Sequence, residues 1–475
     1  MKNPIDPRNT FDLIVIGAGP AGVSAALRAS ELGARVALVD RQRMGGTCTN
    51  TGCVPTRVLA ITARLLRDIR GANTYGIQID APGLDWPQTV RKVRQVIADI
   101  QNMKRIQDKL RDVGGELFLE GTASFLDSNT IKLGDSGREL MAEKFILAVG
   151  GKPRRLPFPG AELALMPDEV IDLEKLPRSV AIVGSGYTGV QLATVMNAFG
   201  VAVTLLETAP NILPPADPDV ARVLRESFEL QGMRVVTGLS NLDHIIQEMP
   251  KVKRISYARN GVMCFAQVET VILAVGWPAD LDGLSLAQAG VEVERGFIKM
   301  NPQLQTTASH IYVAGDAIGR DMLVQGAIFE AEVAAENAVL GQSIEYQQAS
   351  LPSGGFTDPD HAGVGLGEPQ VRSSGRPYRV AMIHYADLER AIIDSRKVGF
   401  FKLIADASTG HILGAHAAGE NAVEIIQAMA IAIAAGATVT TLGKVRFAYP
   451  TYSAIIGEAA RKLLSVSKCN KALEQ

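Results

Sequence analysis

Two cysteines, Cys48 and Cys53, give the sequence its clearest candidate for redox chemistry. They lie in the segment Gly45-Gly-Thr-Cys-Thr-Asn-Thr-Gly-Cys-Val-Pro55, with four residues between them. In a reducing compartment, a cysteine pair at short spacing favours thiol–disulfide exchange over a purely structural bridge. A bridge at this spacing needs a distorted turn, which Gly52 makes easier to adopt. The alternative is two buried free cysteines that pack as small hydrophobic side chains.

The cysteine segment follows a strand–helix–strand unit that predicts a dinucleotide site. Phe11–Ile16 is predicted as a buried strand, Val23–Leu32 as a helix, and Arg35–Val39 as a second strand that ends in Asp40. The glycines between the first strand and the helix permit a tight turn and a close approach of backbone to pyrophosphate. Asp40 lies 23 residues after the first glycine, where its carboxylate can bond a ribose. The glycines of this first fingerprint are Gly17, Gly19 and Gly22.

The same pattern occurs a second time and implies a second dinucleotide. A predicted strand, Ser179–Val183, is followed by glycines, a helix through Phe199, a strand at Val203–Leu206, and Glu207. A carboxylate can bond a free ribose 2′-hydroxyl but repels a 2′-phosphate, so Glu207 favours NADH over NADPH. The alternative is that Glu207 is only a solvated strand end. The glycines of this second fingerprint are Gly184, Gly186 and Gly189.

The rest of the chain connects and follows these two units. Trp86–Val113 has apolar residues at helical spacing, and Leu117–Leu133 is predicted as short strands with turns. Phe145–Gly151 and Val271–Gly276 resemble each other, each a hydrophobic strand that ends in glycine. From about Gly354 onward, strands and an alanine-rich helix predict a separate α+β domain.

Composition excludes several classes of function. At 475 residues the chain is long enough for about three domains. Its 47% hydrophobic and 21% charged residues are typical of a globular protein, and a net charge of −2 offers no excess of positive charge for nucleic acid or an anionic membrane. Met1–Asp12 lacks the apolar stretch of a signal peptide, and Ala428–Ala437 is too short to span a bilayer. We expect a cytoplasmic protein.

Five segments together resemble the flavin-dependent pyridine nucleotide-disulfide oxidoreductases, the family of lipoamide dehydrogenase, glutathione reductase and mercuric reductase. They are the two fingerprints, the cysteine segment, Ile311–Asp316 and Pro450-Thr451. The resemblance implies an α/β fold with two Rossmann-like dinucleotide-binding domains plus a C-terminal α+β dimerisation domain. We expect an FAD-binding and central domain at residues 1–152 and 280–348, an NAD(H)-binding domain at 153–279, and a dimerisation domain at 349–475.

The resemblance also implies roles for individual residues. FAD would bind at the first fingerprint and a nicotinamide nucleotide at the second, and Asp316 would bond the ribityl chain of the flavin. Cys53 would be the thiolate that faces the flavin, and Cys48 the thiol that exchanges with substrate after reduced flavin has opened their disulfide. The C-terminal domain would form a homodimer. Further cofactor contacts are expected at Gly46, Thr47 and Gly276.

One departure from the family concerns proton transfer. Disulfide-reducing members carry His-Pro-Thr with a glutamate three residues after the threonine, and this pair moves protons to and from substrate thiols. Here Tyr449 replaces the histidine and Ala454 the glutamate. A tyrosine with a pKa near ~10 is a poor base at neutral pH. Mercuric reductases also carry tyrosine in this region, where it assists metal handling; the alternative is that Tyr449 only fills space.

A second departure concerns charge beside the flavin. Family members usually carry lysine where Arg57 stands and glutamate where Gln191 stands, and the two form an ion pair. Arg57 with an uncharged Gln191 leaves one additional positive charge, which would favour the anionic reduced flavin and the Cys53 thiolate. The alternative is that Arg57 points to solvent and Gln191 packs within a helix.

These features predict an FAD-dependent oxidoreductase that prefers NADH to NADPH and passes electrons through Cys48 and Cys53. The acceptor would be a soft metal ion such as Hg(II) or Cu(II), which thiolates suit, or a quinone or dye that takes electrons directly from the flavin. One alternative is a disulfide reductase of lipoamide dehydrogenase type with an impaired dyad, and another is a redox-sensing flavoprotein without turnover. We expect no nucleic-acid or membrane partner and no resident metal. Cys264 is expected to be an inert core residue, and Cys469 lies in a polar tail.

Overall fold

The computed structural model describes residues 7–41, 43–346 and 351–473, with side chains up to Ser465. The chain divides into two compact units, which are described separately. The first comprises residues 1–59, 85–154 and 276–349, and the second comprises residues 60–84, 155–275 and 350–475. The mixed α/β architecture expected from the sequence is confirmed in both.

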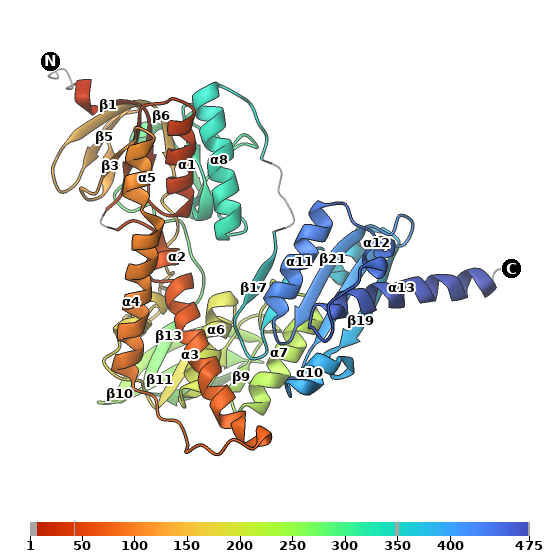
Figure 1. Cartoon of the computed structure of the whole chain (residues 1–475). Coiled ribbons are helices and arrows are strands. Elements are labelled where there is room, and N and C mark those ends of the chain that lie inside the picture. The colour runs from red at the N-terminus through yellow and green to blue at the C-terminus, as the bar shows by residue number, and fades with distance from the viewer. Residues whose placement is uncertain (1–6, 42, 347–350, 474–475) are drawn as a thin grey trace. The chain divides into compact units, whose positions relative to one another are not determined.

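The first unit is built on a seven-stranded sheet. Strands β3, β2, β1, β6 and β16 run parallel in that order, and β5 and β4 add an antiparallel edge. Helices α1 and α8 lie side by side against this sheet (Figure 1). The elements are β1 (Thr10–Ile16), α1 (Pro20–Glu31), β2 (Val36–Val39), α2 (Gly46–Asn50), α3 (Cys53–Gly71, which continues into the second unit), α4 (Trp86–Lys104), α5 (Ile106–Asp112), β3 (Glu116–Phe118), β4 (Ala123–Phe125), β5 (Thr130–Leu133), β6 (Glu139–Leu147), β14 (Val293–Glu294), β15 (Phe297–Ile298), β16 (Ile311–Val313) and α8 (Val324–Leu340).

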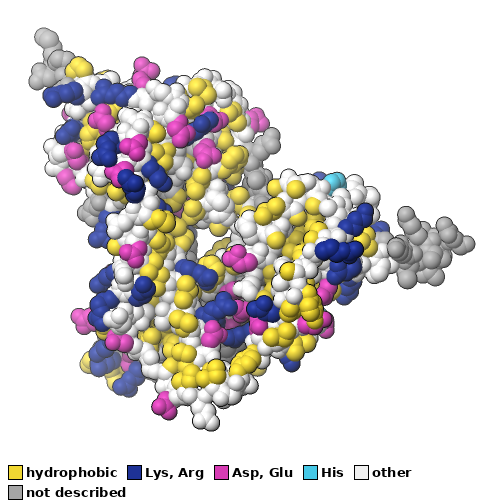
Figure 2. All heavy atoms as spheres, viewed as in Figure 1, with side chains coloured by type: hydrophobic (Ala, Val, Ile, Leu, Met, Phe, Trp, Pro, Cys, Tyr) yellow, Lys and Arg dark blue, Asp and Glu magenta, His cyan; other side chains and the backbone are white. Residues whose placement is uncertain are grey.

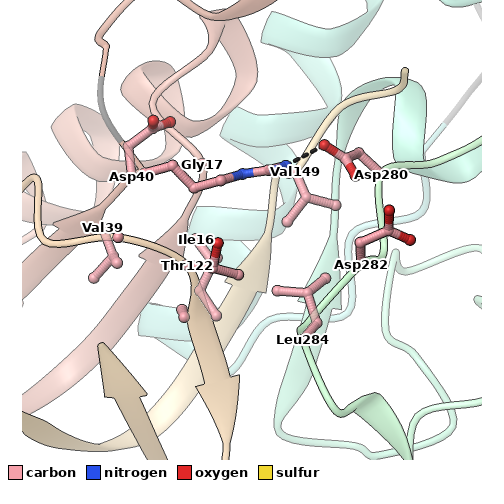
Figure 3. A pocket seen from close by; sticks show the side chains of 12 residues that line it. Ile16, Gly17, Val39, Asp40, Thr122, Val149, Asp280, Asp282 and Leu284 are labelled. Carbon is pink, nitrogen blue, oxygen red and sulfur yellow. Dashed lines mark hydrogen bonds and ion pairs between the residues drawn. The ribbon is translucent and has the colours of Figure 1, made fainter. Parts of the chain in front are cut away.

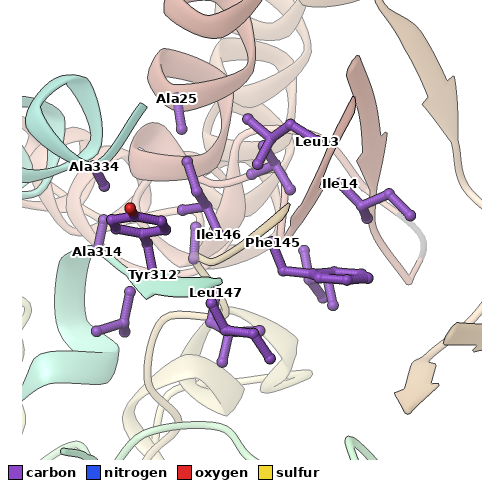
Figure 4. Close-up of a cluster of buried hydrophobic side chains, with 14 of the residues drawn as sticks. Leu13, Ile14, Ala25, Phe145, Ile146, Leu147, Tyr312, Ala314 and Ala334 are labelled. Atoms are coloured by element: carbon purple, nitrogen blue, oxygen red, sulfur yellow. The ribbon is translucent and has the colours of Figure 1, made fainter. Parts of the chain in front are cut away.

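The core of the first unit explains why these segments adopt this arrangement. Strand β2 is buried along its whole length, as expected for a parallel strand covered on both faces. Large side chains of the central strands, such as Leu13, Ile146 and Tyr312, meet small side chains of the helices, such as Ala25 and Ala334 (Figure 4). The small residues let α1 and α8 approach the sheet closely. The fingerprint turn is thereby fixed between a rigid strand and a rigid helix.

The second unit contains three sheets. Four parallel strands lie in the order β13-β7-β8-β9, and β10, β11 and β12 form an antiparallel sheet. The third sheet is antiparallel, in the order β17-β18-β21-β20-β19, with α11 packed on β18 and β21 (Figure 1). The elements are β7 (Ser179–Val183), α6 (Tyr187–Ala198), β8 (Ala202–Leu206), α7 (Pro218–Leu230), β9 (Arg234–Val236), β10 (Leu239–Met249), β11 (Val252–Arg259), β12 (Val262–Val268), β13 (Thr270–Leu273), β17 (Ser353–Gly355), β18 (His361–Gly365), α9 (Glu368–Ser373), β19 (Tyr378–His384), α10 (Glu389–Ile393), β20 (Phe400–Asp406), β21 (Ile412–Ala418), α11 (Ala422–Ala434), α12 (Val439–Lys444) and α13 (Ala454–Leu473).

Two predicted helices of the first unit depart from the sequence prediction. The single helix expected over Trp86–Val113 is two helices, α4 and α5, because Arg105 between them adopts a left-handed conformation with φ of +47°. The first fingerprint helix begins at Pro20 rather than Val23, because proline at the first helical position needs no hydrogen-bond partner.

Surface charge agrees with the composition. Basic and acidic side chains are interspersed on the face that Figure 2 presents. In the described part of the chain, none of the helices combines the length and the apolar character needed to cross a bilayer.

Candidate functional site

The first fingerprint joins β1 to α1 through a turn that only glycine allows. Gly17 has φ of +107°, and a Cβ there would lie 2.3 Å from the carbonyl oxygen of Ala148. A Cβ on Gly22 would lie 1.6 Å from the carbonyl oxygen of Gly17. No side chain among the described residues caps the first turn of α1, so its N–H groups are available to a pyrophosphate. The turn therefore fits a bound dinucleotide.

Asp40 ends β2 beside this turn and adjoins a cavity. Its Oδ2 accepts a hydrogen bond from the Ala18 N–H at 2.6 Å. The cavity is bordered by the ends of β1 and β2 and by Asp280 and Asp282 (Figure 3). Arg41 forms an ion pair with Asp280, drawn as the dashed line in Figure 3. The carboxylate of Asp40, which can accept a hydrogen bond from a ribose, thus lies next to Arg41, whose guanidinium group can bind a phosphate.

The cysteine segment packs directly against the first fingerprint. Gly46, with φ of +59°, approaches Gly19 so closely that a Cβ on Gly46 would lie 2.7 Å from the Gly19 Cα. Helix α2 begins there and carries Cys48, and Cys53 is the first residue of α3. A cysteine at a helix N-terminus is favoured as a thiolate by the helix dipole. The same backbone contact therefore places the cysteine pair next to the dinucleotide turn.

The two cysteines are thiols in this structure, and their protonation is unequal. The hydrogen bond between them raises the pKa of Cys48 far above its ordinary value and lowers the pKa of Cys53 to about 7. Burial raises both pKa values, and the positive charge of Lys104 lowers both. Lys104, at the end of α4, also donates from Nζ to Thr49 Oγ1 at 2.9 Å. At neutral pH, Cys53 is therefore partly ionised while Cys48 keeps its proton.

Asp316 lies on a turn that a second buried carboxyl group holds in place. Gly315 lies shortly after β16 and has φ of +77°. Burial raises the pKa of the next residue, Asp316. Glu330 on α8 is 4% exposed and accepts a hydrogen bond from the Gly315 N–H at 2.8 Å. Burial raises the pKa of Glu330 to about 7. The negative charge of Asp316 raises the pKa of both Cys48 and Cys53, so Asp316 lies near the cysteine pair.

The second fingerprint repeats the backbone geometry of the first. Gly184 has φ of +92°, and a Cβ on Gly189 would lie 1.9 Å from the Gly184 carbonyl oxygen. Glu207 accepts four hydrogen bonds. Ser185 donates its N–H at 2.7 Å and its hydroxyl at 2.6 Å to Oε2, and Ala209 N–H and Thr208 Oγ1 donate to Oε1 at 2.8 Å and 3.1 Å. Burial raises the pKa of Glu207, but these hydrogen bonds outweigh it and hold the pKa below its ordinary value.

The chain matches the models of one known protein family over most of its length. Residues 11–331 match the family described as pyridine nucleotide-disulphide oxidoreductase, and residues 351–460 match the dimerisation domain of that family. The chain belongs to the pyridine nucleotide-disulphide oxidoreductases. It is therefore an oxidoreductase of a family that uses FAD and a pyridine nucleotide, and the dimerisation domain supports a homodimer.

Individual relatives agree with this assignment. A dihydrolipoyl dehydrogenase from Thermus scotoductus is 32% identical over 465 residues, which are 96% of this chain and 97% of that protein. A mercuric reductase from Bacillus cereus is 31% identical over 93% of this chain and 69% of its own length. The solved structure of the Cu(II) complex of the HOCl-induced flavoprotein disulfide reductase RclA from Escherichia coli shares the fold, with a TM-score of 0.84 and 24% identity over 96% of this chain and 99% of that chain.

In this oxidoreductase, Tyr449 lies in the dimerisation domain and is 78% exposed. It borders a cavity whose lining among the described residues includes Ala454 and Glu458 but no histidine. Arg446 and Arg461 also line this cavity. Burial raises the pKa of Glu458, and the nearby charge of Glu389 raises it further. The described lining of the cavity therefore offers the carboxyl groups of Glu389 and Glu458 and several guanidinium groups near Tyr449, but no imidazole.

The predicted site residues divide between the two units. The first fingerprint, Gly46, Thr47, the cysteines, Arg57, Gly276 and Asp316 belong to the first unit, whereas the second fingerprint, Gln191, Glu207 and Tyr449 belong to the second. The uncompensated charge of Arg57 beside the flavin and the catalytic role of Tyr449 stay predictions. Cys264 on β12 is half-buried and packs against a core cluster of the second unit, so it lies at the edge of the core rather than fully inside it. The side chain of Cys469 lies outside the described residues.

Three contributors to the site escaped the sequence analysis. They are Lys104 beside the cysteines, Glu330 behind Asp316, and Asp280 opposite Arg41. Lys104 lies 55 residues from its partner Thr49 and belongs to no motif. Glu330 carried no distinct signal, because α8 also contains Glu332 and Glu336 and the sequence alone does not show which of the three is buried.

Proposed function

We propose that this protein passes electrons from NADH, through FAD, to Cys48 and Cys53 and then to an acceptor that is not a dithiol. A soft metal ion is the first candidate acceptor, and a quinone that takes electrons directly from the flavin is the second. The observation that carries this proposal is the cavity around Tyr449, whose described lining contains no histidine. Dithiol chemistry requires proton transfer at two sulfurs, and positioned bases supply it in enzymes that act on such substrates.

The cysteines carry the chemistry on the protein side. FAD, when bound, supplies the two-electron carrier between nicotinamide and cysteines. Opening a Cys48–Cys53 disulfide takes two electrons and, at neutral pH, about one proton, because Cys53 forms as a thiolate and Cys48 as a thiol. Lys104 stabilises the thiolate by its charge. When a metal ion coordinates Cys48, the thiol proton is released to solvent. The Cys48 thiolate is then the group that binds the acceptor.

Two soft sulfur ligands suit a soft metal ion as the acceptor. Thiolates bind such ions more strongly than oxygen ligands do. A relative named mercuric reductase supports a substrate of this class. Among the described residues, no group of three or more histidine, cysteine or acidic side chains has the arrangement of a metal site. The cysteine pair is accordingly the place where we propose that the metal substrate binds.

NADH is the proposed donor because of the charge of Glu207. Its four hydrogen bonds already occupy the acceptor positions of the carboxylate, so it discriminates through repulsion of a 2′-phosphate rather than through a ribose hydrogen bond. The depressed pKa keeps this charge in place throughout the neutral range.

Steady-state NADH oxidation with a panel of acceptors tests the proposal. Hg(II), Cu(II), a soluble quinone, oxidised lipoamide and oxidised glutathione are compared in the full-length protein. We expect a metal ion or the quinone to exceed both disulfides by at least about tenfold. Cys48→Ser should abolish metal-dependent turnover and leave quinone-dependent turnover intact, and Cys264→Ser serves as the matched control. Turnover of lipoamide at the rate of the best other acceptor would contradict the proposal.

A second candidate is a disulfide reductase of lipoamide dehydrogenase type. The observation that favours it is Glu458, a half-buried carboxyl group in the cavity of Tyr449, one helical turn after Ala454. If Glu458 already acts with Tyr449 as an acid–base pair, then Glu458→Gln lowers the rate of dihydrolipoamide oxidation. If the dyad is missing, Tyr449→His with Ala454→Glu raises that rate by about 10²-fold or more, and Glu458→Gln has no effect on it.

A further inference from the structure

A buried histidine with one unpaired nitrogen lies against the start of helix α6. His361, the first residue of β18, is 1% exposed, and its Nε2 has no hydrogen-bond partner among the described residues. Its ring stacks on that of Tyr187, the first residue of α6, with 9° between the planes and 5.9 Å between the centroids. The hydroxyl group of Tyr187 shares a hydrogen bond with Ser353 Oγ at 3.1 Å. Since α6 follows the second fingerprint, these contacts bear on the nucleotide site.

Hydrogen bonding fixes which nitrogen of His361 carries the proton. Thr357 Oγ1 lies 2.6 Å from the carbonyl oxygen of Pro359 and 2.8 Å from His361 Nδ1. A carbonyl oxygen only accepts, so the one hydroxyl proton of Thr357 goes to Pro359, and His361 Nδ1–H donates to Thr357. Nε2 is therefore an acceptor without a proton. Burial lowers the pKa of His361 to about 4, which keeps Nε2 unprotonated at neutral pH.

This nitrogen borders the carboxamide of Gln191 across Gly355. A Cβ on Gly355 would lie 2.9 Å from His361 Nε2 and 3.3 Å from Gln191 Cδ, so both groups border one small space that only glycine leaves open. Gln191 donates from Nε2 to the Tyr187 carbonyl oxygen at 2.9 Å and accepts from the Phe356 N–H at 3.3 Å. A carboxamide has two N–H donors, and the second one has no recorded acceptor among the described residues.

We propose that His361 is a positioning residue for helix α6: its ring holds Tyr187, and its unprotonated Nε2 makes an amide, rather than a carboxylate, the fitting side chain at position 191. An amide can donate to a bare nitrogen. A carboxylate at 191 would face the nitrogen's lone pair and draw a proton onto the imidazole. No charged side chain of the described residues contributes to the pKa shift of His361, so that carboxylate would dominate its environment.

The inference rests on the proposed function only in taking α6 as the helix of the pyridine-nucleotide site. The first test needs neither turnover nor added nucleotide. Deuterium exchange at the imidazole C2 position, followed by mass spectrometry over a range of pH, reports the titration of each histidine in the FAD-containing protein. In wild type, His361 should titrate near 4, and Gln191→Glu should raise this midpoint by about two pH units.

Two controls accompany that measurement. His416 is also buried, bonds the Leu366 carbonyl oxygen at 3.0 Å, and should not move in Gln191→Glu. Gln107→Glu, which adds the same charge on exposed helix α5, should leave His361 unchanged. A His361 midpoint that stays within half a pH unit of wild type in Gln191→Glu overturns the proposal.

A second pair of variants tests the positioning role if Gln191→Glu does not fold. His361→Leu should weaken NAD⁺ binding about fivefold by calorimetry, with FAD content unchanged. His361→Gln, which keeps an acceptor at the position of Nε2, should restore most of the affinity. If His361 only fills space, His361→Leu removes an unpaired buried polar atom, raises the Tm and leaves NAD⁺ affinity unchanged, which overturns the proposal. A protein that binds NAD⁺ in this way but does not oxidise NADH would instead overturn the proposed function.

Discussion

The two glycine fingerprints have the same backbone and different side-chain surroundings. In each, the first glycine has a positive φ near +100° and the third would clash with the carbonyl oxygen of the first if it carried a Cβ. In each, the acid at the end of the next strand accepts a hydrogen bond from the N–H between the first two glycines, at 2.6 Å for Asp40 and 2.7 Å for Glu207. The steric requirements of the turn therefore determine the backbone geometry that the two fingerprints share.

The difference lies in what surrounds each acid. Asp40 adjoins a cavity in which Arg41 pairs with Asp280. Glu207 is 9% exposed, and protein donors, including the Ser185 hydroxyl, fill its acceptor positions. The first site therefore offers hydrogen-bond acceptors and a cation to its ligand, and the second offers mainly a fixed negative charge. We therefore propose that these side chains select the cofactor, and that the shared turn supplies only the capacity to bind a dinucleotide.

The largest expected effects come from the glycines at the helix starts. Gly22→Ala should destabilise the protein by about 3 kcal/mol and abolish FAD binding, because the new Cβ would overlap the Gly17 carbonyl group. Gly189→Ala should leave FAD in place and abolish NAD⁺ binding. FAD absorbance, calorimetry with NAD⁺ and thermal unfolding distinguish the two. If Gly189→Ala loses FAD and Gly22→Ala keeps it, the assignment of cofactors to the two sites is reversed.

A smaller effect is expected from removing the charge at the second site. Glu207→Gln should raise the ratio of kcat/KM for NADPH to that for NADH by about tenfold, because repulsion of the 2′-phosphate disappears. In wild type the ratio should stay flat between pH 8 and 7, where Glu207 and the 2′-phosphate of NADPH both keep their full charge. The depressed pKa of Glu207 keeps its carboxylate charged as pH falls further. Asp40→Asn should not change this ratio, and a change there would show that the first acid also affects nucleotide choice.

The smallest effect tests the saturation of Glu207 by its protein donors. Ser185→Ala removes the hydroxyl donor at 2.6 Å and frees one acceptor position on a carboxylate that stays ionised. A ribose hydroxyl can then take that position, so NAD⁺ affinity should increase about threefold in calorimetric titrations. Thr194→Ala, which removes another buried hydroxyl of the same unit, provides the control. Weaker binding in Ser185→Ala would mean that Ser185 itself contacts the nucleotide.

The fold was largely predictable because its signals are local. The strand–glycine–helix–strand order around Gly17 and Gly184 predicted both nucleotide-binding sheets, and the strand at Ser179–Val183 is confirmed at its predicted bounds. The break at Arg105 was not predictable from apolar spacing, since a single left-handed residue leaves the hydrophobic pattern intact.

The site was less predictable, because its tuning comes from residues distant in sequence. Motif spacing located Cys48 and Cys53, and the unequal pKa values of the pair agree with the thiolate role that family resemblance implied for Cys53. Lys104 on α4 donates a hydrogen bond to Thr49 of the cysteine helix α2. His361 and Gln191 border the same small space beside Gly355. No pattern of residue types marks such contacts, since they depend on how separate segments pack.

Anaerobic titration of the purified protein with NADH tests most directly whether the cysteines accept electrons in series with the flavin. Each equivalent of NADH delivers two electrons, and flavin and disulfide each accept two. Wild type should therefore consume about two equivalents per FAD before NADH accumulates, and Cys48→Ser should consume about one. Consumption of one equivalent by both proteins would show that Cys48 and Cys53 do not carry electrons and would contradict the account.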